Sequence, residues 1–456
     1  MSKHVIIMEF PWGRDKDPRV PLGHASLIST LECSSNISYS SLIYPVNEAN
    51  ESLTEQIITE INHISEEYLD VDIAIGVYVW AEDIIQNLLV AIRNIGFSGR
   101  IILGGPQITY SGPGLEAIYP DADIFVRGYG EIALLGILQN KNIPIPGVHY
   151  AGELDLCQQT SVNLELLPSP WLNGVISLEG QKFIRWETQR GCPFRCGFCQ
   201  HKEAGKRLKK TEFDGTRVFK EIDLFCNSEV KEIAILDPIF NAGSKSIPIL
   251  KRFIENRFKG NISLQCRAEM CIDEFLETAA KLDVKLEFGL QTIHKNEGQA
   301  VGRTNNMRRV NEVFEKLNQE ELYHEVSIIF GLPNQTLESF IETVEWCLNK
   351  SIPVIKAFPL MLLRGTDIEQ RKHEWNLIES NDSMPTVIQS DSFSYSEWLE
   401  MFRISEALKQ TESNHPKSIE QLLEISKHVQ IDYERFRPNT NLKVKQNQLQ
   451  AIEIEV

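Results

Sequence analysis

The chain has 456 residues, of which 42% are hydrophobic and 24% charged, and its formal net charge is −17. This composition is that of a folded protein. The net negative charge argues against a protein whose whole surface binds nucleic acid. The nine cysteines are an odd number, which fits a reducing compartment better than a disulfide framework. No apolar run approaches the ~20 residues that a membrane helix needs. We therefore expect a cytoplasmic protein that binds neither membrane nor nucleic acid.

The first 140 residues alternate short apolar runs with amphipathic stretches, which is typical of a parallel sheet covered by helices on both faces. In Ser52–Leu69 and Glu82–Ile95, apolar side chains recur with the helical period along one face. We expect a Rossmann-like α/β domain over 1–140, with ligands bound beyond the carboxyl ends of its strands. The expected strands are Val5–Met8, Ile37–Ile43, Ile73–Val79, Ile101–Leu103 and Ile124–Val126.

The rest of the chain divides into three further parts. Residues 141–180 are expected to be a connector, in which Ile176–Leu178 forms a hairpin with Phe183–Trp186. Over 181–380 the alternation resumes for six units, which predicts a partial (βα)6 TIM-like barrel with functional groups at the strand carboxyl ends. Residues 381–456 are expected to form a small C-terminal region with a helix at Ser418–His428. The barrel strands are expected at Phe183–Glu187, Ile233–Leu236, Ile262–Cys266, Lys285–Leu290, Glu325–Phe330 and Val354–Phe358.

Three of the nine cysteines, Cys192, Cys196 and Cys199, fall within eight residues directly after the first barrel strand. Thiolates are preferred ligands of iron–sulfur clusters and of zinc, so a loop this rich in cysteine can wrap one compact metal centre. Three thiolates would bind three irons of a cubane and leave the fourth iron open. With His201 as a fourth ligand the loop would instead suit a closed zinc site. Chance clustering of thiols is the third alternative.

The spacing Cys-x-x-x-Cys-x-x-Cys, with Phe198 before the last cysteine, resembles the signature of radical S-adenosylmethionine (SAM) enzymes. The resemblance implies that Cys192, Cys196 and Cys199 hold a 4Fe–4S cluster whose open iron chelates SAM. Electron transfer would then cleave SAM to a 5′-deoxyadenosyl radical. It also implies that Phe198 lies near the adenine, and that a reductant such as a flavodoxin or ferredoxin supplies the electron.

Segments at the later strand ends resemble the same family in order. Asp237 stands where the family contacts the SAM amino nitrogen, although the commoner Gly-Gly-Glu is absent here. Arg267 and Glu269 stand where contacts to the SAM carboxylate or the substrate are made. Gln291 ends the strand near the ribose, and Gly331 belongs to a glycine motif beside the adenine. Taken singly, each of these segments also reads as ordinary strand-end turn chemistry.

A Rossmann-like domain before such a barrel resembles the cobalamin-binding class of radical SAM enzymes, in which the corrin sits between the two domains. Gly104, Gly105 and Gly128 lie in strand-end loops like those of that class, where glycine lets the backbone approach a large ligand. The Asp-x-His-x-x-Gly motif of several cobalamin proteins is absent from 1–140, and His24 and His63 are expected to have surface or packing roles. The alternative is a Rossmann-like domain that only packs against the barrel.

The resemblance predicts an enzyme that abstracts hydrogen from an unactivated carbon of a small molecule and methylates that carbon with the help of cobalamin. One alternative is a radical SAM enzyme without methyl transfer, which catalyses a rearrangement, a cyclisation or another group transfer. The other is a non-catalytic sensor that binds zinc or a cofactor. The basic segment 202–210 is expected to be a solvated loop, with attraction of an anionic substrate or an electron donor as the alternative.

Overall fold

The structure is a computed structural model, which describes residues 3–48, 52–139, 144–201, 210–432 and 436–437. The chain forms two compact units. Unit 1 comprises Met1–Phe194, Gln200–Leu264 and Asp273–Val284, and unit 2 comprises Arg195–Cys199, Gln265–Ile272 and Lys285–Val456. Among the described residues, no helix combines the length and the apolar character that crossing a bilayer requires.

The first sheet confirms the expected Rossmann-like α/β architecture. Its strand order is β2-β1-β3-β4-β5-β6, the order of doubly wound flavodoxin-like sheets with one strand added at the edge. The first five strands pair in parallel, whereas β6 runs antiparallel to β5 and was not expected from the sequence. The strands are β1 (Lys3–Glu9), β2 (Ile37–Ile43), β3 (Val71–Gly76), β4 (Ile101–Gly104), β5 (Ile124–Val126) and β6 (Val148–Tyr150).

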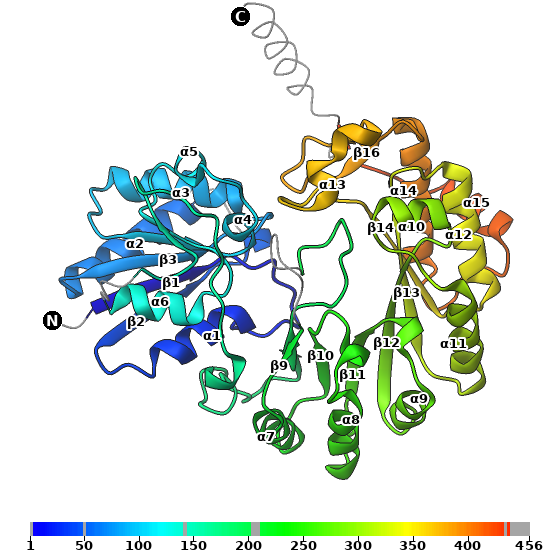
Figure 1. Cartoon of the computed structure of the whole chain (residues 1–456), viewed down its shortest axis with the longest axis horizontal. Coiled ribbons are helices and arrows are strands. Elements are labelled where there is room, and N and C mark those ends of the chain that lie inside the picture. The colour runs from blue at the N-terminus through cyan, green and yellow to red at the C-terminus, as the bar shows by residue number, and fades with distance from the viewer. Residues whose placement is uncertain (1–2, 49–51, 140–143, 202–209, 433–435, 438–456) are drawn as a thin grey trace, which may run out of the picture. The chain divides into compact units, whose positions relative to one another are not determined.

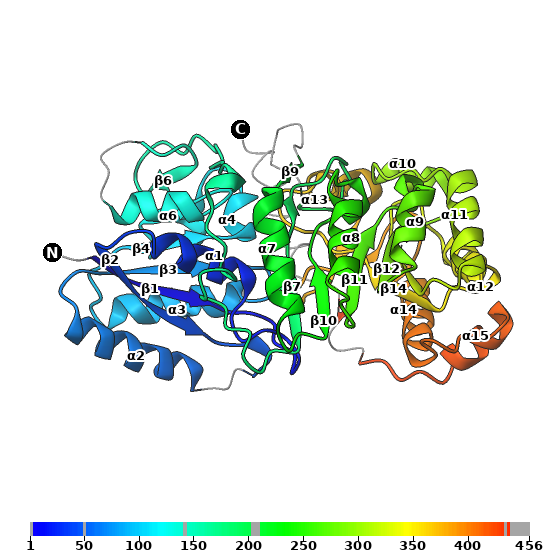
Figure 2. The same ribbon diagram turned by 90° about the horizontal axis from the view of Figure 1, so that it is seen from below.

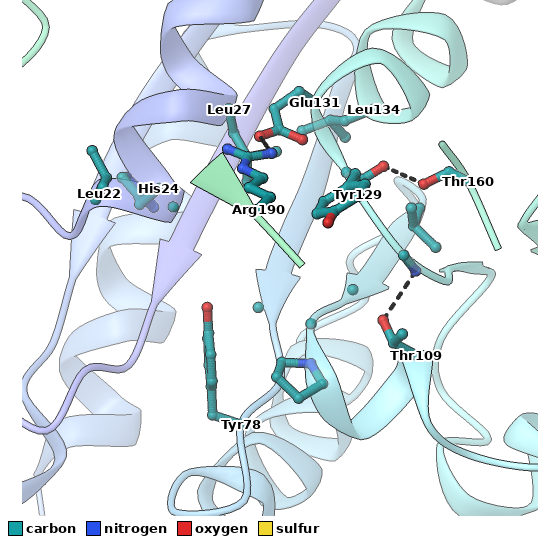
Figure 3. A pocket seen from close by; sticks show the side chains of 18 of the residues that line it. Leu22, His24, Leu27, Tyr78, Thr109, Tyr129, Glu131, Leu134, Thr160 and Arg190 are labelled. Carbon is teal, nitrogen blue, oxygen red and sulfur yellow. Dashed lines mark hydrogen bonds and ion pairs between the residues drawn. The ribbon is translucent and has the colours of Figure 1, made fainter. Parts of the chain in front are cut away.

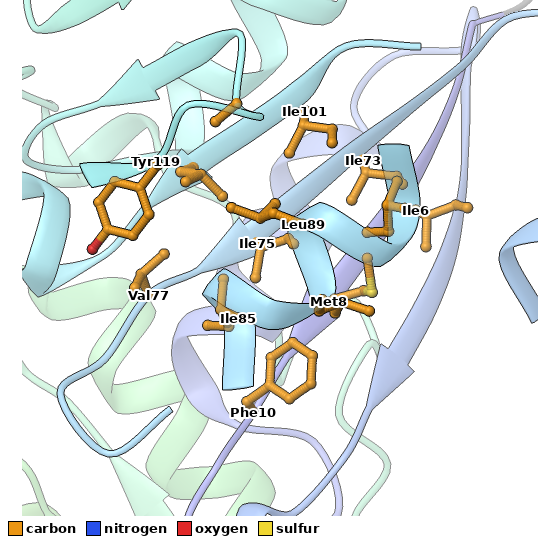
Figure 4. Close-up of a cluster of buried hydrophobic side chains, with 14 of the residues drawn as sticks. Ile6, Met8, Phe10, Ile73, Ile75, Val77, Ile85, Leu89, Ile101 and Tyr119 are labelled. Carbon is orange, nitrogen blue, oxygen red and sulfur yellow. The ribbon is translucent and has the colours of Figure 1, made fainter. Parts of the chain in front are cut away.

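Helices cover both faces of this sheet (Figure 1). On β1, Ile6 and Met8 face one hydrophobic cluster while Val5 and Ile7 face the other, because successive side chains of a strand point to opposite sides. The first cluster, seen in Figure 4, is completed by α2 (Leu53–Glu67) and α3 (Glu82–Asn94). The second is completed by α1 (Leu22–Leu31) and α6 (Glu131–Leu138). A strand buried on both faces reads as a continuous apolar run, which explains why β1, β4 and β5 were predictable.

The second sheet confirms the partial barrel, with strand order β7-β10-β11-β12-β13-β14 and all six strands where the sequence predicts them. Figure 2 labels β7, β10, β11 and β12 of this sheet. The pairs β7–β10, β10–β11, β12–β13 and β13–β14 are parallel. The strands are β7 (Phe183–Trp186), β10 (Glu232–Ile235), β11 (Asn261–Cys266), β12 (Asp283–Gln291), β13 (His324–Phe330) and β14 (Val354–Pro359). The principal helices that follow them are α7 (Gly215–Cys226), α8 (Ser246–Glu255), α9 (Asp273–Ala279), α11 (Met307–Gln319), α12 (Leu337–Asn349) and α14 (Tyr395–Gln410).

The expected hairpin before the barrel is wrong. Residues 176–178 are not a strand, and β7 pairs in parallel with β10 instead. Three of the four side chains of β7 are buried, which suits a parallel barrel strand better than a surface hairpin. The Ile176 amide donates to the Pro170 carbonyl, so this segment satisfies its backbone locally.

The C-terminal region contains the predicted helix, α15 (Ile419–Ser426), whose N-cap is Ser418. It also contains α14, which was not expected from the sequence and which packs against β13 and β14. A signal for α14 was present: Ser394 and Glu397 form a capping box at its start.

Candidate cofactor-binding site

Unit 1 contains a cavity of about 500 Å³ at the carboxyl ends of β1, β3, β4 and β5 (Figure 3). This edge includes the point between β1 and β3 where the strand order reverses, which is where doubly wound sheets bind their ligands. All three predicted glycines, Gly104, Gly105 and Gly128, line the cavity. A Cβ atom on Gly105, whose φ is +89°, would lie 2.8 Å from the Val77 backbone, so glycine is needed for this close approach.

Two titratable side chains in the cavity wall are kept neutral by burial. Burial raises the pKa of the Glu9 carboxyl to about 8. Burial also lowers the pKa of His24 to about 4. The Nε2 atom of His24 lies 2.7 Å from Ser41 Oγ, whereas its buried Nδ1 has no hydrogen-bond partner among the described residues. His24 therefore lies in the cavity wall, not at the surface, and carries one polar atom that a bound ligand could satisfy.

A Glu9→Gln substitution is expected to change the pH dependence of stability. The pKa of Glu9 is raised by folding, so its stabilising contribution is complete below the unfolded value of 4.5 and is lost as pH rises through about 8. Thermal melts from pH 5 to 9 should show the wild type losing stability relative to Glu9→Gln, at most about 1.4 kcal/mol per pH unit. The exposed Glu48→Gln is the control. Parallel profiles for wild type and Glu9→Gln would contradict the assignment.

The half-buried Arg190 lines the cavity and contacts side chains from several elements of unit 1. It follows β7 on the short strand β8 (Gln189–Arg190), which pairs with β9 (Thr211–Glu212). Arg190 Nη1 lies 2.7 Å from Glu131 Oε1, and Nη2 lies 2.8 Å from Glu187 Oε1. Ser26 Oγ donates to Glu131 at 2.9 Å, and the guanidinium stands 5.2 Å from the Tyr129 ring centroid. Although burial opposes it, the Arg190 charge holds the pKa of Glu131 below its ordinary value.

Asp237 lies in the same unit, two residues after β10. Its carboxylate binds Thr188 and Gln189, which precede the cysteine loop. Its Oδ1 accepts hydrogen bonds from the Thr188 and Gln189 amides at 2.7 and 3.1 Å, and its Oδ2 accepts one from the Thr188 hydroxyl. Burial raises the pKa of Asp237 to about 7 despite these donors. These contacts of Asp237 thus go to Thr188 and Gln189, in the segment that follows β7, and the contact of Asp237 with SAM stays a prediction.

The cysteine loop is divided between the units, with Cys192 in unit 1 and Cys196 and Cys199 in unit 2. All three cysteines and Phe198 are half-buried. Within the part of the chain that the structure describes, no three His, Cys, Asp or Glu side chains are gathered into a metal-binding group. The donor chemistry nevertheless fits an iron–sulfur cluster, because three cysteines are available on one short loop. Their role as ligands therefore stays a prediction from spacing and residue type.

Unit 2 contains other predicted residues, at or just beyond the ends of β11, β12 and β13. Arg267 is buried and pairs with Glu269, with Nε to Oε2 at 3.2 Å, and also donates to the Thr304 carbonyl. Gln291 has a φ of +69° at the end of β12. Gly331 has a φ of +86°, and a Cβ there would lie 3.3 Å from the Val387 carbonyl. The structure therefore places these residues at or just after the carboxyl ends of barrel strands, and their contacts with SAM stay predictions.

A buried polar network behind Gly331 was missed by sequence reasoning. Gln335 Oε1 accepts from the amides of Gly331 and Leu332 at 2.7 and 3.1 Å, and so fixes the loop after β13. Its Nε2 donates to the Ile329 carbonyl and to Glu297, which also accepts from Thr292 at 2.5 Å. Burial raises the pKa of Glu297. Nothing in the local pattern distinguishes a buried glutamine from an exposed one, so no sequence signal was available.

Most of the basic segment, residues 202–209, lies outside the described residues. Lys210 is described, and its Nζ donates to Glu212 and to the Ala242 carbonyl, each at 2.6 Å. Lys210 is therefore engaged in local contacts within unit 1.

Comparisons with known proteins show which proteins this chain resembles. Residues 186–347 match the family model of the radical SAM superfamily. The cobalamin-dependent radical SAM methyltransferase TokK of Streptomyces tokunonensis is 22% identical over 312 residues, which cover 62% of this chain and 46% of TokK. The chain thus spans less than half the length of this curated relative.

Two solved structures share the fold. TsrM of Kitasatospora setae, a radical SAM methyltransferase solved with cobalamin and a [4Fe-4S] cluster, has a TM-score of 0.64 and 14% identity, covering 82% of this chain and 75% of TsrM. OxsB, a cobalamin-dependent SAM radical enzyme solved with aqua-cobalamin and SAM, has a TM-score of 0.69 and 15% identity, covering 90% of this chain and 67% of OxsB. Residues 186–347 are therefore a radical SAM domain, and the chain has the fold of TsrM and OxsB.

Proposed function

We propose that the protein is a cytoplasmic radical SAM enzyme that uses cobalamin to methylate an unactivated carbon of a small molecule. The observation that carries the proposal is the cavity at the switch point of a doubly wound sheet, in a chain whose next domain is of the radical SAM superfamily. Arg190 lines this cavity and stands two residues before Cys192, so the cofactor pocket and the cysteine loop are adjacent along the chain.

The residues of each unit have separate tasks in this proposal. Cys192, Cys196 and Cys199 would hold a 4Fe–4S cluster, which supplies the electron that cleaves SAM to a 5′-deoxyadenosyl radical. In unit 1, the glycines at the strand ends would admit the corrin, which supplies the methyl group. The Nδ1 atom of His24 and the protonated Glu9 carboxyl would offer neutral polar contacts there.

The protein's remaining task is to bind and seclude the substrate. A reactive radical must be protected from water and oxygen, which a closed site at the carboxyl ends of the barrel strands would provide. Arg267, paired with Glu269 at the end of β11, would orient a carboxylate of SAM or of the substrate. A small-molecule substrate and a reductant of the flavodoxin or ferredoxin type are the proposed partners.

The proposal is tested with anaerobically purified and reconstituted protein. We expect about four irons and four sulfides per chain, a cobalamin visible spectrum after expression with cobalamin uptake, and 5′-deoxyadenosine from SAM under reducing conditions. If the protein retains no cobalamin but still forms 5′-deoxyadenosine from SAM, the result would favour a radical enzyme without methyl transfer. One zinc per chain and no iron after reconstitution would favour the sensor and contradict the proposal.

A further inference from the structure

Arg303, in unit 2, is a buried cation without a carboxylate partner among the described residues. Its exposed fraction is 7%, and it lies just beyond α10 (Lys295–Ala300). Its Nη2 donates to the Gly289 carbonyl, and its Nη1 lies 4.0 Å from Cys196 Sγ. The Nε atom is buried and has no hydrogen-bond partner in the described structure. Burying a guanidinium is costly unless an anion compensates its charge, so this arrangement requires an explanation.

The backbone around Arg303 fixes its position relative to Cys196. The Gly197 amide donates to the Val301 carbonyl at 2.8 Å. Gly302 has a φ of +62°, and a Cβ there would lie 2.9 Å from the Arg195 carbonyl oxygen. The segment that carries Arg303 is therefore held against the cysteine loop by main-chain contacts. The Arg303 side chain is itself buried and donates to the Gly289 carbonyl, so the guanidinium does not reach the sulfur across solvent.

We propose that Arg303 is the counter-charge of the Cys196 thiolate and an N–H donor to it, and that it makes a cluster bound through Cys196 easier to reduce. The inference rests on the proposed function, in which Cys196 is a cluster ligand. Hydrogen bonds to cluster sulfurs and nearby charge set the reduction potential of an iron–sulfur cluster, and charge-assisted hydrogen bonds are the stronger ones. Arg303 is thus a positioning residue that acts on the cluster through its ligand.

The test compares Arg303→Met and Arg303→Lys with Arg308→Met, a control whose side chain is 90% exposed and pairs with Glu312. Each protein is reconstituted anaerobically, its iron and sulfide are measured, and its cluster is titrated by EPR at controlled potential without SAM. We expect a more negative midpoint potential for Arg303→Met, a smaller shift for Arg303→Lys, and none for Arg308→Met. If Arg303→Met takes up no iron, the charge-retaining Arg303→Lys variant provides the readout.

The outcomes separate this inference from the proposed function. A wild-type protein that binds no iron would contradict the proposed function and would overturn the role of Arg303 as well. A wild-type cluster whose potential is the same in all variants overturns the role of Arg303 alone. Weaker binding of SAM, with an unchanged potential in its absence, would assign the guanidinium to the SAM carboxylate and would also overturn the inference.

Discussion

Replacing Cys192, Cys196 and Cys199 together by alanine is expected to abolish cluster binding. Iron after anaerobic reconstitution should fall from about four per chain to the background of a cluster-free protein, and 5′-deoxyadenosine should no longer form from SAM. The three thiols are half-buried, so their removal leaves no large cavity and the protein should remain folded. Iron and sulfide analysis, the visible spectrum and product chromatography measure the result.

Cys226→Ala is the matched control, because Cys226 is also half-buried and burial raises the pKa of its thiol to about 11. A protonated thiol is a poor metal ligand, so this variant should retain its iron and its activity. Iron that persists in the triple variant would contradict the ligand assignment. Zinc that disappears with the three cysteines, in a protein that never held iron, would identify the loop as a zinc site.

Some strands were predictable as short apolar runs, such as Val5–Met8 within β1, and others from apolar residues that alternate with polar ones, as in β12. Five strands of the first sheet and all six of the barrel appear where the sequence predicts them. Helix α1 was harder to recognise, because its buried positions include His24, Ser26 and Ser29 and so lack a clear apolar stripe. The edge strand β6 has only three residues and runs antiparallel to its neighbour, so neither its length nor its direction follows the alternating pattern.

The candidate site was predictable only in part, for a physical reason. Chemistry that depends on spacing within one loop, as for the three cysteines, is visible in the sequence. Chemistry that depends on tertiary pairing is not: Arg190 meets Glu131 across 59 positions of the chain, and Arg303 approaches Cys196 across 107. His24 was expected at the surface or in packing; it is buried, as the packing alternative predicts, and it also lines the cavity, which its residue type does not indicate. Residue type alone cannot reveal such positions.

Arg190→Met is expected to destabilise unit 1 strongly and to weaken cobalamin binding. The substitution leaves Glu131 buried without its cation and Glu187 without its partner. Removing one member of a buried ion pair costs about 3–5 kcal/mol, because the remaining charge is uncompensated. Thermal melts and cobalamin titration, monitored by the visible spectrum, measure the two effects. Arg252→Met is the control: the Arg252 side chain is 36% exposed and pairs with Asp223, so it should cost less than about 1 kcal/mol.

The defect of Arg190→Met should grow as pH rises. In the wild type the Arg190 charge lowers the pKa of Glu131, whereas without it burial would raise that pKa above the ordinary value. A raised pKa gives a stability contribution that is complete at low pH and is lost as pH increases through the folded value. The variant should therefore be closer to wild type at pH 5.5 than at pH 8. Adding Glu131→Gln and Glu187→Gln removes the unpaired carboxylates, and this triple variant should recover most of the stability at pH 8. A single variant as stable as wild type at pH 8 would show that Arg190 does not hold these elements together.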